Sequence, residues 1–533
     1  MYRSSFGFSF GRTGENSELG GSSVSGMVAS LLRQTNGLCP SIPQCLPFDR
    51  RFGQKWQKST KSKCFASPGL TGGQSSENAL LSKMTKEKKA SVRALGCRLN
   101  QYEALALEGK LKEAGYEIVS FGDEADIGVI NSCTVTREAD AKSRNAIRRF
   151  IRKNPEAIMV VVGCYSQMAA NRVAMIDGVD FVIGNQDKLN FLDYLTDEKP
   201  ETPVVIRERI SRDDFSIGFV GETDFEQRAN LKIQDGCDFM CSFCIIPFAR
   251  GRARSRDWTD LFEEAKGMVR KGVREFVLTG VNLGTYLSGA KDFLSLVKGL
   301  SKLPGVERLR ISSIEPTTIP EELFEMMSDP ECSLMPYLHV PMQACCDRTL
   351  TRMKRKYGME EMISFFDRAA SSVSNLCLGT DLMMGFPGES ESDFEETCEN
   401  FLTLPFSYCH TFTFSEREGT PAAKMKGQVP AEERRRRSAH LRGLSASKKM
   451  NFHEAQLGKE FQVLLENPKD GFYGGYTEHY VRVVVPQEPL GLENRMARIR
   501  MLVASPELVE GSLLTYEKKD NVLSGAELSV RNA

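Results

Sequence analysis

The chain has 533 residues, and its 70 lysines and arginines balance its 70 aspartates and glutamates, so the formal net charge is zero. This length corresponds to about three to four domains, and neutrality excludes a uniformly basic nucleic-acid coat while it leaves local basic faces open. No run of about 18 uncharged apolar residues occurs, so the sequence predicts no membrane-spanning helix. The 15 cysteines are an odd number and include a closely spaced group, which favours metal or cluster chemistry in a reducing compartment over a secreted disulfide scaffold.

The first 83 residues differ in composition from the rest of the chain. They are rich in serine, basic and poor in acidic residues, with no sustained helical or strand period. We therefore expect residues 1–86 to be an extension that is disordered or resembles an organelle transit peptide. The alternative is that translation starts at Met84. The expected location is the cytoplasm, or a mitochondrion or plastid if the extension is a transit peptide.

Three apolar runs separated by two helical patterns follow the extension. The runs are residues 91–95, 127–130 and 158–162, and the helical patterns are residues 101–114 and 140–153. This βαβαβ order predicts an α/β domain with a Rossmann-like parallel sheet. A cysteine follows each run, namely Cys97, Cys133 and Cys164. Because the carboxyl ends of parallel strands open onto one edge, where ligands bind, we expect the three thiols to converge.

Three converging thiolates can hold a [4Fe–4S] cluster and leave one coordination position open. Two alternatives remain, because zinc can use the same ligands and because free cysteines are often simply buried. A second cysteine motif favours iron–sulfur chemistry. It has the spacing CxxxCxxC, follows the apolar residues 231–234, and consists of Cys237, Cys241 and Cys244.

Three thiolates on one short loop can hold three irons of a cubane, which leaves the fourth iron free to bind a small molecule. This spacing is the pattern of radical S-adenosylmethionine (SAM) proteins. A zinc knuckle is the alternative, but a structural zinc ion needs four protein ligands, and no paired CxxC or HxxxH follows nearby.

Strand-like segments recur after this loop, with helical patterns between them. They are residues 275–279, 307–312, 337–340, 376–383 and 408–414. With residues 231–234 they make six strands, which predicts a partial (β/α)6 barrel. Polar or glycine-rich segments follow most of these strands, and in such barrels these loops build the active site.

The chain changes character again after residue 456, where turns that contain glycine or proline separate short strand-like segments at residues 461–465, 480–485, 498–503 and 513–516. This pattern predicts a small β-barrel. Four side chains in it either stack on nucleic-acid bases or belong to the barrel core. They are Tyr473, Tyr476, His479 and Tyr480.

Basic side chains cluster at four places despite the overall neutrality. Arg144, Arg148 and Arg152 lie four residues apart and predict a stripe on one helix. The other three groups are residues 250–256, 352–356 and 434–437. Such groups bind phosphates, and the alternatives are solvated helix faces and structural ion pairs.

The cysteine motifs and the segment Gly385-Phe386-Pro387-Gly388-Glu389 resemble those of radical SAM methylthiotransferases over residues 90–518. The resemblance implies a sequence of domains. They are a methylthiotransferase N-terminal domain at 87–205, a radical SAM domain at 223–456, a TRAM domain at 457–519 and a tail at 520–533.

The resemblance implies an enzyme with two [4Fe–4S] clusters and SAM. The cluster on Cys237, Cys241 and Cys244 is expected to bind SAM and to support its cleavage to a 5′-deoxyadenosyl radical. The cluster on Cys97, Cys133 and Cys164 is expected to carry the sulfur. The side chains expected to contact SAM are Asn282, Ser313, Glu315 and Gln343. The implied partners are tRNA, an electron donor and a sulfur donor.

Within this family, the segment Gly96-Cys97-Arg98-Leu99-Asn100-Gln101-Tyr102-Glu103 most resembles the branch that acts on N6-threonylcarbamoyladenosine (t6A) in tRNA. The alternatives are the branches for isopentenyladenosine in tRNA and for an aspartate of a ribosomal protein, and an inactive RNA-binding iron–sulfur protein. One departure stands out, because Gln343-Ala344-Cys345-Cys346 replaces the usual Gln-Ser-Gly-Ser.

Overall fold

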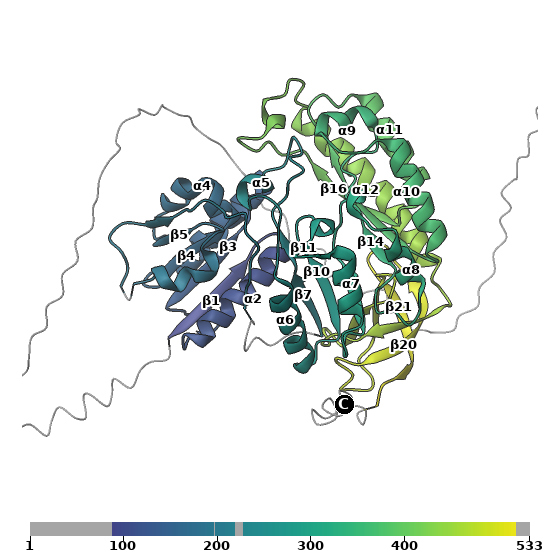
Figure 1. Ribbon diagram of the computed structural model, residues 1–533, viewed down its shortest axis with the longest axis horizontal. Coiled ribbons are helices and arrows are strands. Elements are labelled where there is room, and N and C mark those ends of the chain that lie inside the picture. The colour runs from purple at the N-terminus through teal and green to yellow at the C-terminus, as the bar shows by residue number, and fades with distance from the viewer. Residues whose placement is uncertain (1–87, 197, 219–226, 519–533) are drawn as a thin grey trace, which may run out of the picture. The chain divides into compact units, whose positions relative to one another are not determined.

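The computed structural model describes residues 88–196, 198–218 and 227–518 (Figure 1). The expected extension at 1–86 and the tail at 520–533 lie outside the described residues. Within the described ranges, no helix combines the length and the apolar character that crossing a membrane requires.

A six-stranded parallel sheet forms the N-terminal part, in the order β2-β1-β3-β4-β5-β6 (Figure 1). The strands are β1 (Lys89–Ala94), β2 (Glu117–Ile118), β3 (Ile127–Ser132), β4 (Ile158–Gly163), β5 (Phe181–Ile183) and β6 (Val204–Ile206). The helices are α2 (Arg98–Glu113), α3 (Arg137–Lys153) and α4 (Cys164–Ala174). All six residues of β3 are buried, as expected for a strand covered on both faces. The predicted parallel sheet is confirmed.

Six parallel strands form the middle part as two three-stranded sheets, β7-β10-β13 and β14-β15-β16. They are β7 (Arg228–Lys232), β10 (Glu275–Thr279), β13 (Arg308–Ile311), β14 (Tyr337–His339), β15 (Cys377–Met384) and β16 (Tyr408–Thr413). Backbone hydrogen bonds join the two sheets, because Leu309 bonds to Ser333 and Met335 at 2.7 and 2.9 Å. The expected six strands of a partial barrel are present.

The helices that follow the barrel strands bury one apolar face each in a single large core. They are α6 (Trp258–Arg270), α7 (Phe293–Ser301), α8 (Glu322–Ser328), α9 (Asp347–Met353), α10 (Met359–Ser372), α11 (Glu391–Thr403) and α12 (Ala431–Glu454). Helix α12 packs on the last strand, where Ser445 Oγ bonds to both the N–H and the carbonyl of Cys409 at 2.9 Å.

Five strands form the C-terminal part, in the order β17-β20-β21-β19-β18. They are β17 (Glu460–Leu464), β18 (Phe472–Tyr476), β19 (Arg482–Pro486), β20 (Met496–Ala504) and β21 (Val509–Tyr516). The sheet curls, because Glu466, two residues beyond β17, bonds to Gly474 of β18 at 2.8 Å. Gly475 permits this approach, since a Cβ there would lie 2.5 Å from the carbonyl oxygen of Leu464. The glycines made β18 look like a turn in the sequence.

Candidate functional site

The CxxxCxxC cysteines line one cavity of about 150 Å³ at the carboxyl end of the barrel strands. Its loop begins after β8 (Gln234–Asp235) and ends at the short helix α5 (Ile246–Ala249). Gly236 turns the chain into this loop with a φ of +71°, and a Cβ there would lie 2.0 Å from the carbonyl oxygen of Arg252. Only glycine fits such a position without displacing backbone.

All four side chains that the sequence singled out for SAM line this same cavity. They are Asn282, Ser313, Glu315 and Gln343. Asn282 is 3% exposed, and its Nδ2 has no hydrogen-bond partner among the described residues. An unpaired buried amide is costly, so this donor fits a bound ligand that presents an acceptor group. Contact with SAM itself stays a prediction.

Burial favours the protonated form of two thiols of this loop, Cys237 and Cys244. Burial raises the pKa of Cys237, and it raises the pKa of Cys244 to about 12. Two donors already face the sulfurs, because Phe239 N lies 3.5 Å from Cys237 Sγ and Arg355 Nη1 lies 3.3 Å from Cys241 Sγ. Metal ions displace thiol protons, and such donors stabilise the thiolate charge, so these residues fit an iron–sulfur cluster.

Arg355 is a site residue that the sequence did not single out. Its guanidinium is buried and donates to both carboxylate oxygens of Glu315, at 2.7 and 2.8 Å, and to the hydroxyl of Tyr357. The sequence placed Arg355 in a basic group that binds phosphates, and for this side chain that interpretation is wrong. The partner that neutralises it lies 40 residues away and is not visible in the local pattern.

The other three cysteines meet at the carboxyl ends of β1, β3 and β4. Burial, with smaller contributions from the neighbouring Cys164 and Cys97, raises the pKa of Cys133 to about 11. A Cβ on Gly96 would lie 2.5 Å from Cys133 Sγ, which shows how closely the first strand end approaches the second. Cys97 is exposed while Cys133 and Cys164 are buried, so this site opens on the Cys97 side.

Each cysteine group offers three thiols to a metal centre. A structural zinc ion needs four protein ligands, whereas three thiolates can each bind a different iron of a cubane and leave one iron open. The donor set of each group therefore suits a [4Fe–4S] cluster better than a structural zinc ion.

A buried ionic network connects the two cysteine sites. Arg250, which follows the CxxxCxxC loop, donates to Glu103 of α2 at 2.9 Å and to Asp235 at 3.0 Å. Glu103 also contacts Lys232 at 2.7 Å and Lys188 at 2.5 Å. Burial alone raises the pKa of Glu103, but Arg250, Lys188 and Lys232 together hold it well below its usual range. The sequence left phosphate binding and structural ion pairing open for Arg250, and the structure shows structural ion pairing.

The other basic groups contain both exposed side chains and side chains that are buried in ion pairs. Arg148 and Arg152 are exposed on α3, as the predicted stripe requires. Arg437, in contrast, is buried and bonds to Glu389 at 2.6 Å. Its group is therefore in part structural.

The aromatic side chains of the C-terminal sheet are packed against protein. Tyr473 is fully buried in the core of this sheet. The ring of Tyr480 lies between those of Tyr337 and Tyr476, with centroids at 4.3 and 4.6 Å. Tyr473 therefore belongs to the core, whereas Tyr476, His479 and Tyr480 are half-buried, and base stacking stays a prediction for these three.

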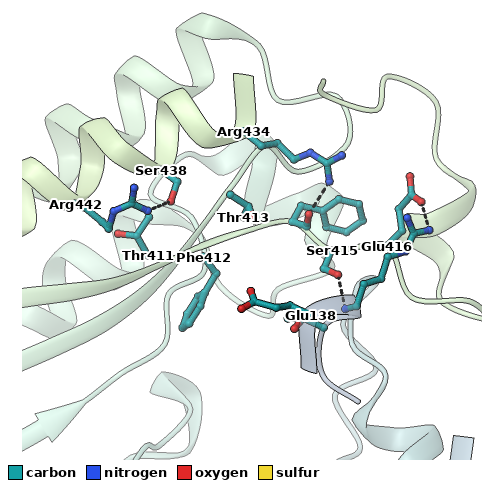
Figure 2. A pocket seen from close by; sticks show the side chains of 12 residues that line it. Glu138, Thr411, Phe412, Thr413, Ser415, Glu416, Arg434, Ser438 and Arg442 are labelled. Atoms are coloured by element: carbon teal, nitrogen blue, oxygen red, sulfur yellow. Dashed lines mark hydrogen bonds and ion pairs between the residues drawn. The ribbon is translucent and has the colours of Figure 1, made fainter. Parts of the chain in front are cut away.

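A cavity of about 350 Å³ lies between the start of α3, strand β16 and helix α12 (Figure 2). Figure 2 shows Phe412 on the opposite side of β16 from Arg434 and Arg442. The ring of Phe412 is 43% exposed, which is unusual for phenylalanine and leaves an aromatic face open to a ligand.

Two family profiles match the chain. One, described as uncharacterized protein family UPF0004, matches residues 89–184, and the Radical SAM superfamily matches residues 231–401. The threonylcarbamoyladenosine tRNA methylthiotransferase MtaB of Bacillus subtilis is 37% identical over 446 residues, which cover 79% of this chain and 95% of that protein.

The enzyme of the same description from Aquifex aeolicus is 38% identical over 381 residues, which cover 71% of this chain and 92% of that protein. A tRNA-2-methylthio-N(6)-dimethylallyladenosine synthase of Anaplasma phagocytophilum is 33% identical over 445 residues, which cover 80% of this chain and 98% of the relative.

Proposed function

Because the chain belongs to the radical SAM methylthiotransferases, with MtaB enzymes among its relatives, we propose that it converts t6A in tRNA to its 2-methylthio derivative. SAM and [4Fe–4S] clusters are the cofactors of this chemistry. The observation that carries the proposal is the presence of two separate cysteine groups in one compact unit, joined through the buried network around Glu103 and Arg250.

Each group has one role in the proposal. Cys237, Cys241 and Cys244 hold the cluster that binds SAM. Cys97, Cys133 and Cys164 hold the cluster that carries sulfur. When bound, these groups supply a carbon-centred radical, which can remove hydrogen from an unactivated carbon, and the sulfur that replaces it.

The protein's own residues position and shield the reacting groups. Gln234 Oε1 accepts hydrogen bonds from the backbone N–H groups of Val281 and Asn282 at 2.8 and 2.9 Å, which fixes the loop on which Asn282 faces the cavity. Arg355 holds Glu315 in the same wall. We assign Asn282, Ser313, Glu315 and Gln343 to SAM binding on this basis.

The proposal includes the other partners. The substrate is tRNA, and turnover requires an electron donor and a sulfur donor. The cytoplasm is the proposed location.

A second candidate is the same reaction on N6-dimethylallyladenosine. The relative from Anaplasma phagocytophilum supports it, because it carries this activity in its description and matches over nearly its whole length. The two candidates differ in the charge of the N6 substituent, since the threonylcarbamoyl group has a carboxylate and the dimethylallyl group has no polar atom.

Mass spectrometry of tRNA nucleosides tests the proposal. Cells that lack this chain but contain t6A are complemented with the intact chain, with Cys237→Ala, with Cys97→Ala, or with Cys332→Ala as a control that belongs to neither cysteine group. We expect 2-methylthio-t6A with the intact chain and with Cys332→Ala only. Formation of the dimethylallyl product instead would establish the second candidate, and no methylthio nucleoside at all would refute both.

A further inference from the structure

Polar side chains of β14, β15 and β16 form a cluster inside the barrel that begins at the proposed SAM cavity. His339 Nδ1 shares a hydrogen bond of 2.9 Å with Ser313 Oγ, and Ser313 lines that cavity. On the other side, His339 Nε2 lies 3.2 Å from Asp381 Oδ1, and the ring of His410 has its centroid 5.4 Å from that of His339. Gly379 makes room for this cluster, since a Cβ there would lie 2.9 Å from the His339 ring.

His339 is 5% exposed, yet its Nε2 has no well-aligned hydrogen-bond partner in the described part of the chain. The carboxylate of Asp381 is near but poorly aligned with it. A buried imidazole nitrogen with spare hydrogen-bonding capacity points to a ligand that completes it.

Arg98 reaches the same region from the other cysteine site. It follows Cys97 directly, and its Nη2 donates to the hydroxyl of Tyr480 at 2.7 Å. Arg98 and His410 line one cavity of about 410 Å³, together with Tyr337, Tyr408 and Tyr480. The cluster therefore spans the interval between the two cysteine sites.

Arg98 has no carboxylate partner in the part of the chain that the structure describes. Arg250 and Arg355, the other arginines beside the cysteine sites, are each paired with a glutamate. The cavity of Arg98 is also lined by Arg482, which is paired with Glu466, and by Lys449 and Glu507, whose charges balance. Among these lining residues, the half-buried guanidinium of Arg98 is the charge without a balancing carboxylate, and such a group favours an anionic ligand.

Under the proposed function, the reacting adenosine lies between the two cysteine sites, because hydrogen is removed beside one of them and sulfur arrives from the other. Strand β16 offers an aromatic face to this adenosine. Phe412 lies two residues after His410 on β16, so both side chains project from the same face of the strand. An extruded base can stack on such an open aromatic ring.

We propose that Arg98, with His339 and His410, binds the carboxylate-bearing N6 substituent of the substrate adenosine, while Phe412 stacks on its base. This inference rests on the proposed function, since only the threonylcarbamoyl group brings a carboxylate. Guanidinium and carboxylate form paired hydrogen bonds, and a dimethylallyl group leaves Arg98 without its acceptor. A site built to hydrogen-bond a polar group strongly rejects an analogue without that group, because the polar atoms of the site are then left unpaired. An apolar pocket discriminates much less against a ligand that carries an extra group.

Binding of short RNAs to the reconstituted full-length chain tests this assignment. Three anticodon stem-loops that differ only at the target position carry t6A, N6-dimethylallyladenosine or adenosine, and their dissociation constants are measured by fluorescence anisotropy. We expect the intact chain to prefer the t6A RNA over the adenosine RNA. Arg98→Gln is expected to reduce this preference at least tenfold and to change the affinity for the adenosine RNA little.

Two other variants separate a local role from a general one. Arg98→Lys keeps the positive charge and is expected to retain part of the preference. Arg148→Gln, on the exposed stripe of α3, is expected to weaken all three RNAs equally, as loss of a phosphate contact does. Iron content is measured for each variant, because Arg98 follows Cys97. If Arg98→Gln loses iron, the binding experiment is repeated with His410→Phe. An unchanged preference of His410→Phe for the t6A RNA over the adenosine RNA then overturns the assignment.

The outcomes distinguish the subsite from the function. An unchanged preference in Arg98→Gln with its iron intact overturns the subsite, even if 2-methylthio-t6A is formed in cells. The subsite also falls if the intact chain makes this nucleoside yet binds t6A and adenosine RNAs equally. If the intact chain forms no 2-methylthio-t6A, the proposed function fails and the subsite with it.

Discussion

Replacing Glu103 by glutamine removes a carboxylate that contacts three buried cations at once. Glu103 is fully buried and lies within 2.9 Å of Lys188, Lys232 and Arg250. Glutamine has nearly the same shape, so packing is kept while the charge is lost. Breaking a buried pair on one side costs about 3–5 kcal/mol, because Asp235 then remains as the carboxylate facing Arg250 and Lys232, and Lys188 loses its carboxylate partner.

Urea unfolding of the reconstituted chain measures this effect. At a slope of about 3 kcal/mol/M, the expected loss lowers the midpoint by about 1–1.7 M. The matched control is Glu263→Gln on α6, which breaks an exposed ion pair with Lys266 at 2.9 Å and is expected to leave the midpoint almost unchanged, because solvent screens exposed pairs. If Glu103→Gln shifts the midpoint no more than Glu263→Gln does, the buried network does not stabilise the fold and the reasoning is wrong.

The pH dependence gives this prediction a second check. The pKa of Glu103 is lower in the folded chain than the usual 4.5, so the unfolded chain binds the proton more readily. The stability that Glu103 contributes is therefore fully present above about pH 4.5 and is lost as the pH falls below it. The difference in unfolding free energy between the intact chain and Glu103→Gln should be constant near pH 7 and shrink in acid; a difference that grows on acidification contradicts the assigned sign.

Three further predictions concern the two cysteine sites. Asn282→Ala removes the unpaired amide donor of the cavity and is expected to weaken SAM binding about tenfold, measured by equilibrium dialysis, with iron content unchanged; unaltered affinity would exclude Asn282 as a contact. Cys133→Ser is expected to lose about half of the iron in a colorimetric assay, since one of two clusters loses a ligand, whereas Cys332→Ala keeps all of it. Gly236→Ala forces a Cβ to within 2.0 Å of the Arg252 carbonyl and is expected to abolish assembly of the cluster beside it, seen as loss of visible absorbance. A normal spectrum for that variant would show that the loop can turn without glycine.

Local patterns were sufficient for most strands. The predicted run 275–279 coincides with β10, and the predicted runs at 127–130 and 158–162 lie inside β3 and β4. These strands are buried, so their apolar composition marks them directly. Strand β18 was missed because Gly474 and Gly475 resemble a turn. It forms because its neighbours pair with it and because β17 approaches closely enough to require a residue without a side chain.

The basic residues show the opposite case. Arg250, Arg355 and Arg148 are alike in composition and local context, but two are buried in ion pairs and one is exposed. The partner of Arg250 is Glu103, 147 residues earlier, and no period or spacing announces such a pairing. The same is true of Arg98, whose surroundings come from β14, β16 and the C-terminal sheet.

The spacing of the cysteines was enough to propose two clusters, and the strand pattern was enough to place them at the carboxyl ends of parallel strands. Both signals are local properties of the chain. The tertiary structure was needed to learn which arginines of the described residues are neutralised by buried carboxylates and which are exposed. Charge compensation depends on distances between side chains, and those distances exist only once segments far apart in the chain have packed together.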